Sequence, residues 1–200
     1  MPEQILWFAV LIVLMTSITF LLVRDWRISL AILAFQFLGM FLLVNSLWPL
    51  GMSTAKLITG WMTAAILGMT QSSFVIFPQQ EGSWPEGRTF RLFIAALVII
   101  AVISLAPSVL TWLPGISLPV TYGGLILIGM GMLHLGITIQ PLRVTISLLT
   151  VLCGFEILYA SIENSILVAA LLSVINLGLA LVGAYLLIAS QSAHVQKESE

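Results

Sequence analysis

The chain has 200 residues, of which 60% are hydrophobic and only 8% are charged, and its formal net charge is −1. Soluble domains typically contain about 25% charged residues. This composition, with a mean hydropathy of +1.15, therefore excludes an ordinary soluble protein and indicates a membrane protein. The near-neutral charge gives no electrostatic basis for binding nucleic acid. The single cysteine, Cys153, excludes a disulfide within the chain.

Seven apolar segments follow one another along the chain. About 20 helical residues cover a hydrocarbon core of about 30 Å. The segments are 5–23, 28–48, 52–77, 90–110, 118–139, 142–161 and 165–190. Backbone groups inside a bilayer must be hydrogen-bonded internally, so each segment is expected to be a helix. We therefore expect an all-α polytopic membrane protein, a bundle of about seven transmembrane helices in one integral membrane domain, 1–200.

The opening sequence, MPEQILWFAV, has no basic region and no small-residue cleavage site before its long apolar run. This pattern favours a retained first span over a cleaved signal peptide.

Basic residues predict the orientation of these segments. If the seven segments alternate across the membrane, six of the seven basic residues fall on one side: Arg24, Arg27, Arg88, Arg91, Arg143 and Lys197. The exception, Lys56, lies just inside the third segment. Cytoplasmic loops carry an excess of lysine and arginine. We therefore expect the amino terminus outside and the carboxyl terminus in the cytoplasm.

The segment 142–161, LRVTISLLTVLCGFEILYAS, contains an acid, Glu156. Insertion scales give a mid-membrane carboxylate a cost of roughly 2.5–3.5 kcal/mol, and such acids usually mark proton or ion routes. Because desolvation disfavours the charged form, a buried carboxyl can exchange a proton near neutral pH. Thr150 and Cys153 are spaced to extend a polar stripe on its helix face. The alternative is a protonated acid that only hydrogen-bonds a neighbouring helix.

Other polar residues in the apolar segments are weaker candidates. Lys56 either extends to the outer interface or is buried and pairs with an acid. His134 either joins a proton path or makes a hydrogen bond between helices. Asn176 lies about 20 Å from the outer boundary and Glu156 about 10 Å, so the two need not touch. Gln36 is expected to join helices by hydrogen bonds.

No sequence motif for a metal, an iron–sulfur cluster or a nucleotide is present. The predicted cytoplasmic loops are too short to hold such groups. No cofactor is therefore expected on this chain, and any redox catalysis is expected in a partner subunit.

The last two segments resemble the K subunit of respiratory complex I. Arg143 followed by CGFEI at 153–157 is similar to that subunit's arginine loop and Gly-Leu-Glu-type motif. SVINLGLALVGAYLL is similar to its next helix, with Asn176 in place of a second glutamate. The whole layout, including RDWRISLAILAFQFLGMFLLV, resembles the hydrogenase-4 component E family. These likenesses divide the domain into a five-helix part, 1–139, a K-subunit-like hairpin, 140–191, and a polar cytoplasmic tail, 192–200.

The resemblance implies a subunit of the membrane arm of a complex I-like or group 4 hydrogenase-like oxidoreductase, in the inner membrane of a prokaryote. Its implied partners are antiporter-like subunits and subunits that anchor the redox module. Glu156 would belong to a lateral path for protons or sodium, with Lys56, His134 and Asn176 as further members. Asparagine does not titrate, so a relay within this chain would lack its second acid.

Two other functions remain open. A stand-alone ion or solute transporter would show inverted repeats or broken helices, and no internal repeat is apparent in the sequence. A structural assembly subunit would tolerate replacement of Glu156.

The predicted orientation is testable with reporter fusions. Fusions after Gln80 and after Glu200 are both expected to report a cytoplasmic location, since both positions lie on the arginine-rich side. An external location for either one would contradict the span count or the orientation.

Overall fold

The computed structural model describes residues 3–73, 87–113 and 115–198, with side chains described as far as 191. These residues form seven α-helices and no strand, as expected from the sequence. The helices are α1 Glu3–Leu22, α2 Trp26–Val44, α3 Leu50–Ser72, α4 Arg88–Trp112, α5 Leu118–Ile137, α6 Pro141–Tyr159 and α7 Ile166–Glu198. All but α3 are long and apolar enough to cross a membrane. The chain is therefore a multi-pass helical membrane protein.

The third helix differs from the others in polarity. It has 23 residues, which is long enough to span, but Ser53, Lys56 and Thr63 are buried along it. It packs against α2 and α7 within the same bundle. A seventh span therefore stays a prediction. The end of the third predicted segment, residues 74–77, and the side chain of Lys197 lie outside what the structure describes.

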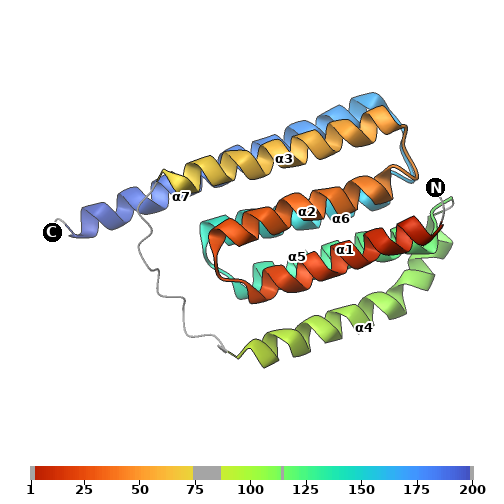
Figure 1. Ribbon diagram of the computed structural model, residues 1–200, viewed down its shortest axis with the longest axis horizontal. Coiled ribbons are helices and arrows are strands. Elements are labelled where there is room, and N and C mark those ends of the chain that lie inside the picture. Colours follow the sequence, from red (N-terminus) through yellow and green to blue (C-terminus); the bar gives the residue numbers. More distant parts are fainter. Residues whose placement is uncertain (1–2, 74–86, 114, 199–200) are drawn as a thin grey trace.

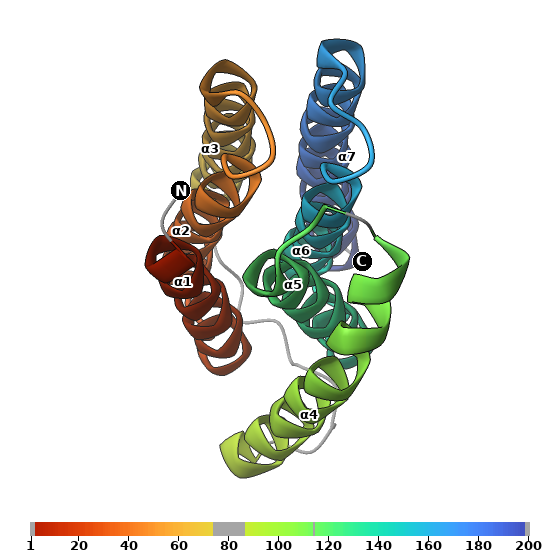
Figure 2. The ribbon, with the colours of Figure 1, turned by 90° about the vertical axis from the view of Figure 1, so that its right-hand side faces the viewer.

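Six of the helices form two rows, which Figure 2 shows nearly end-on. One row is α1, α2 and α3, and the other is α5, α6 and α7. Across the rows, α1 packs on α5, α2 on α6 and α3 on α7. The remaining helix, α4, joins the rows and packs against α5 and α1 at one edge. The buried core therefore lies largely between the rows.

The two rows have similar three-helix arrangements. Helices α1 and α5 both have 20 residues, and α2 and α6 both have 19. The loops inside each matching hairpin, residues 23–25 and 138–140, are equally long. Facing helices run in the same direction (Figure 1). The structure thus contains a parallel repeat of three helices, although no internal repeat is apparent in the sequence.

The arginines of the described residues lie at one end of the bundle, which we call the arginine end. Arg24 lies in the loop between α1 and α2, and Arg27 lies in the first turn of α2. Arg88 and Arg91 lie in the first turn of α4, and Arg143 lies in the first turn of α6. The chain direction in Figure 1 brings all these helix termini to the same end. The structure does not contain a membrane, so the side this end faces remains a prediction.

Glycine contacts set how closely α5 and α6 approach. A Cβ atom added at Gly154 would lie 2.5 Å from the carbonyl oxygen of Gly124, and one at Gly131 would lie 2.9 Å from the amide of Val151. Small residues of this kind let membrane helices pack backbone against backbone. Because Gly154 faces α5, the rotation of α6 is fixed, and Glu156 two residues later is turned into the bundle.

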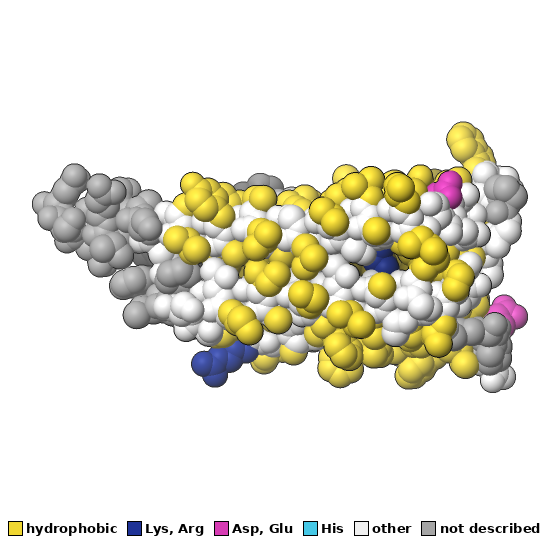
Figure 3. All heavy atoms as spheres, turned by 90° about the horizontal axis from the view of Figure 1, so that it is seen from above, with side chains coloured by type: hydrophobic (Ala, Val, Ile, Leu, Met, Phe, Trp, Pro, Cys, Tyr) yellow, Lys and Arg dark blue, Asp and Glu magenta, His cyan; other side chains and the backbone are white. Residues whose placement is uncertain are grey.

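The outer surface is largely apolar. Figure 3 shows hydrophobic side chains over most of the face that α3 and α7 form. Phe93 on α4 and Leu167 on α7 are among the most exposed, at 69% and 74%. Continuous apolar surface of this extent requires lipid or partner helices.

Candidate functional site

A buried ion pair links α3 to α6. Lys56 Nζ donates to Glu156 Oε1 over 2.6 Å, and the side chains are 2% and 0% exposed. The amide of Asn176 on α7 donates to the same carboxylate oxygen through Nδ2, at 3.0 Å. Asn176 is also fully buried. We call these three residues the ionic cluster.

Helix direction explains why the three side chains meet. The Cα–Cβ bonds of a helix tilt toward its amino terminus. Glu156 lies about one turn before the end of α6 and leans back toward the arginine end. Lys56 and Asn176 lie about two and three turns into α3 and α7, and lean toward the opposite end. Opposed helix directions therefore bring acid and donors to one level.

The structure decides between two readings of Lys56 and corrects one expectation. Lys56 does not extend to the outer interface, because its ammonium forms an ion pair with Glu156 inside the bundle. The expectation that Glu156 and Asn176 lie at separate depths is wrong. The predicted depths assumed a helical rise per residue for residues 160–165, but these six residues form the loop between α6 and α7. The side-chain tilt closes the remaining distance.

The ionic cluster leaves two acceptors without a partner. Glu156 Oε2 and Asn176 Oδ1 are buried and have no hydrogen-bond partner among the described residues. A buried ion pair compensates its desolvation only when geometry is good and the remaining polar atoms are satisfied. The ionised carboxylate is thus only half satisfied. Transfer of one proton from the ammonium to the carboxylate would give a neutral amine and acid with almost no movement of heavy atoms.

A second buried polar group lies between the rows. Thr150 Oγ1 on α6 is 3.1 Å from Gln36 Oε1 on α2, and the amide nitrogen of Gln36 donates to Ser17 Oγ on α1 at 3.3 Å. All three side chains are at most 3% exposed. We call them the hydroxyl–amide chain. Gln36 was expected to join helices, whereas Ser17 could not be distinguished in sequence from neighbouring Thr16 and Thr19.

His134 lies apart from the ionic cluster, in the last turn of α5 near the arginine end. Its ring meets the ring of Phe20 edge-on, with centroids 4.5 Å apart. Neither imidazole nitrogen has a hydrogen-bond partner among the described residues. The histidine is 5% exposed and borders a small pocket together with Arg91 and Arg143. The predicted hydrogen bond to another helix is not present among these residues.

Arg143 and Trp48 join the two rows at opposite ends of the bundle, and Arg91 joins α4 to α1. Arg143 donates to the carbonyl oxygen of Val23 at 2.7 Å, and Arg91 to that of Leu21 at 3.4 Å. Basic side chains are favourable partners for the last carbonyls of a helix, here α1. At the opposite end, the indole of Trp48 donates to the backbone of Glu163 at 3.0 Å. These two arginines therefore join α6 and α4 to the end of α1, in addition to being the signal for the predicted orientation.

Within the described residues, no group of three or more His, Cys, Asp or Glu side chains is placed to hold a metal ion. The ionisable side chains of the ionic cluster are those of Glu156 and Lys56.

Comparison with models of known families, with curated proteins and with solved structures gives no match. The resemblance to the K subunit thus rests on the motifs around Arg143, Glu156 and Asn176, and the resemblance to hydrogenase-4 component E rests on the layout of the whole chain and the segment RDWRISLAILAFQFLGMFLLV.

The ionic cluster predicts strong coupling between its two ions. Lys56→Met should lower the free energy of unfolding by about 3–5 kcal/mol, because it leaves a buried carboxyl without its partner. Lys56→Met combined with Glu156→Leu should recover most of that loss, since no lone ion remains. Thermal unfolding in detergent measures the cycle. Additive effects of the two substitutions would contradict an energetically coupled pair.

Proposed function

We propose that this chain is a membrane-arm subunit of a complex I-like or group 4 hydrogenase-like oxidoreductase, in which Glu156 passes protons through the membrane domain. The observation that carries the proposal is the buried contact of Glu156 with Lys56. Lys56 Nζ and Glu156 Oε1, two titratable groups of opposite charge, are 2.6 Å apart inside an apolar bundle, which is close enough for direct proton transfer.

Stability alone is a poor reason for such a pair. Replacing a buried ion pair by well-packed apolar side chains is often neutral or stabilising by about 1–4 kcal/mol. Ionisable residues in membrane helices are by contrast common in proton relays. The geometry therefore favours a role in transfer over a purely structural role.

The pair also favours protons over sodium. The ammonium of Lys56 occupies the position beside Glu156 Oε1 that a sodium ion would take. Asn176 cannot titrate, but its amide donates to the same oxygen. In this proposal Asn176 orients the carboxylate and favours its ionised form, and Lys56 is the second titrating group.

Partner subunits are required by this function. The chain has no redox motif of its own, so electron transfer must occur in another subunit. The apolar outer faces of α4 and α7 offer surface for neighbouring membrane helices. The resemblance to hydrogenase-4 component E supports antiporter-like and redox-anchoring subunits as these neighbours, in a prokaryotic inner membrane.

A stand-alone transporter is the second candidate. The parallel pair of three-helix rows favours it, because many transporters consist of two structural repeats with the site between them. The ionic cluster does join α3 of one row to α6 and α7 of the other. Robust cation transport by the purified chain in liposomes would support this candidate against the subunit proposal.

Replacement of the acid tests the proposed function. Glu156→Gln keeps the shape and one acceptor but removes the titrating group, so coupled proton transport by the intact complex should fall about tenfold or more. Glu163→Gln is the matched control, because that acid lies in the loop after α6 and its carboxylate accepts from the nearby Ser165 amide. Subunit composition should be normal in both variants. Normal transport with Glu156→Gln would exclude Glu156 as a proton carrier.

A further inference from the structure

The pocket beside His134 has the size of a water site. Its volume is about 20 Å³, and it is lined by Phe20, Leu21, Arg91, His134, Ile137, Thr138 and Arg143. A cavity needs roughly 10–15 Å³ of this kind of space to hold one water molecule. Both imidazole nitrogens of His134 are buried there without a protein partner among the described residues. A water molecule in this pocket would hydrogen-bond one of these two nitrogens, because they point away from each other on the imidazole ring.

The hydroxyl–amide chain begins one helical turn deeper than this pocket. Ser17 precedes Phe20 and Leu21 by three and four residues on α1, and residues at these spacings share a helix face. From Ser17 the hydrogen bonds lead through Gln36 to Thr150. Buried polar side chains thus occur at two successive levels between the arginine end and the middle of the bundle, with Phe20 and Leu21 between them.

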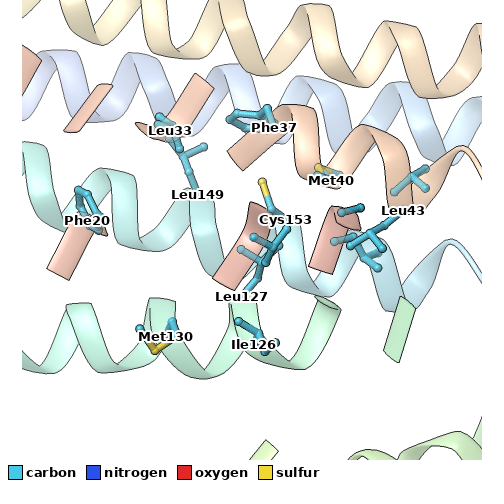
Figure 4. Packing of buried hydrophobic residues seen from close by; sticks show 14 of the residues in the cluster. Phe20, Leu33, Phe37, Met40, Leu43, Ile126, Leu127, Met130, Leu149 and Cys153 are labelled. Carbon is cyan, nitrogen blue, oxygen red and sulfur yellow. The ribbon is translucent and has the colours of Figure 1, made fainter. Parts of the chain in front are cut away.

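An apolar stretch separates Thr150 from the ionic cluster. Glu156 follows Thr150 by six residues on α6, which is about 9 Å along the axis. Cys153 lies midway between them and is fully buried. Figure 4 shows its side chain directed toward Phe37 and Met40 of α2. Both of these side chains are 1% exposed, so the stretch is closed in this conformation.

We propose that protons reach Glu156 from the arginine end, through the His134 pocket and the hydroxyl–amide chain, and that the apolar stretch at Cys153 is the gate of this route. The proposal rests on the proposed function of Glu156 and adds a direction to it. Water molecules carry the proton along the route, and Ser17, Gln36 and Thr150 orient them by hydrogen bonds without ionising. Movement of Phe37 or Met40 admits water past Cys153, and the proton is then taken up by the carboxylate.

This route runs along the helix axes. The resemblance to complex I-related subunits implied a lateral path, whereas the route proposed here to Glu156 is axial. The difference arises because His134, the hydroxyl–amide chain and the ionic cluster lie at successive levels of the bundle. A lateral exit toward partner subunits is then required only beyond Glu156.

The only cysteine of the chain is a native probe of the gate. Ag⁺ is small, travels through water and reacts with thiols. In vesicles of the intact complex, Ag⁺ added on the side of the arginine end should react with Cys153, and Ag⁺ added on the other side should react more slowly. The orientation is set by the reporter fusions described above. After the Ag⁺ exposure the protein is unfolded and treated with maleimide, which labels only those Cys153 thiols that Ag⁺ has not reacted with. Mass spectrometry then measures the labelled fraction.

Two isosteric variants separate the route from general packing. Thr150→Val removes a hydroxyl that contacts Gln36 Oε1 at 3.1 Å and the carbonyl oxygen of Ile146 on its own helix at 2.9 Å. Loss of the contact with Gln36 should slow the Ag⁺ reaction about tenfold, which corresponds to about 1.4 kcal/mol. Thr63→Val removes an equally buried hydroxyl, which donates to the carbonyl oxygen of Thr59 on its own helix, and should leave the rate unchanged. Equal rates for the two variants would overturn the proposal, as would no reaction from the arginine end or faster reaction from the opposite side.

The outcome is independent of the transport test of Glu156. If Glu156→Gln abolishes transport but Cys153 is not reached from the arginine end, the acid carries protons that arrive by another way. If Cys153 is reached and depends on Thr150 while Glu156→Gln transports normally, the route exists but the proposed function of the acid is wrong.

Discussion

An ion pair placed inside an apolar bundle constrains everything around it. Lys56 and Glu156 cannot leave each other without exposing a charge to hydrocarbon, so α3 must stay close enough to α6 for the two side chains to meet. Asn176 brings α7 to the same point through its amide. The glycine contacts between α5 and α6 then matter because they set the rotation that turns Glu156 inward. Lys56 lowers the hydropathy of α3, the least apolar helix, and its ion pair with Glu156 also holds α3 in the bundle.

The two parallel rows give this pair its place in the molecule. Apolar packing between rows is interrupted at two levels, by the ionic cluster and by the hydroxyl–amide chain, and each connects helices of both rows. Backbone contacts of Arg143 and Trp48 join the rows again at the ends. Buried polar contacts specify a unique arrangement only when both partners are present. The two rows thus provide an interface that buries the ion pair of Lys56 and Glu156.

Much of the fold could be predicted from the sequence, because hydrophobic length, loops with proline or glycine and clustered arginines are local signals. The helix limits lie within a few residues of the predicted segments for most helices, and Glu156 was identified because an acid in an apolar segment is costly. The partner of Lys56 could not be predicted. It depends on the rotation and level of three helices that are distant in sequence. For the same reason the contacts Glu156–Asn176 and Gln36–Thr150, and the parallel repeat, required the three-dimensional structure.

The central claim is that Glu156 gains and loses a proton while it remains paired with Lys56. Isotope-edited infrared difference spectroscopy of the intact complex during turnover measures this directly, with the carboxyl band assigned by its loss in Glu156→Gln. The account predicts that this band appears and disappears as the redox module turns over, and that Lys56→Met abolishes the change. A Glu156 carboxyl that keeps one protonation state throughout turnover would contradict the account.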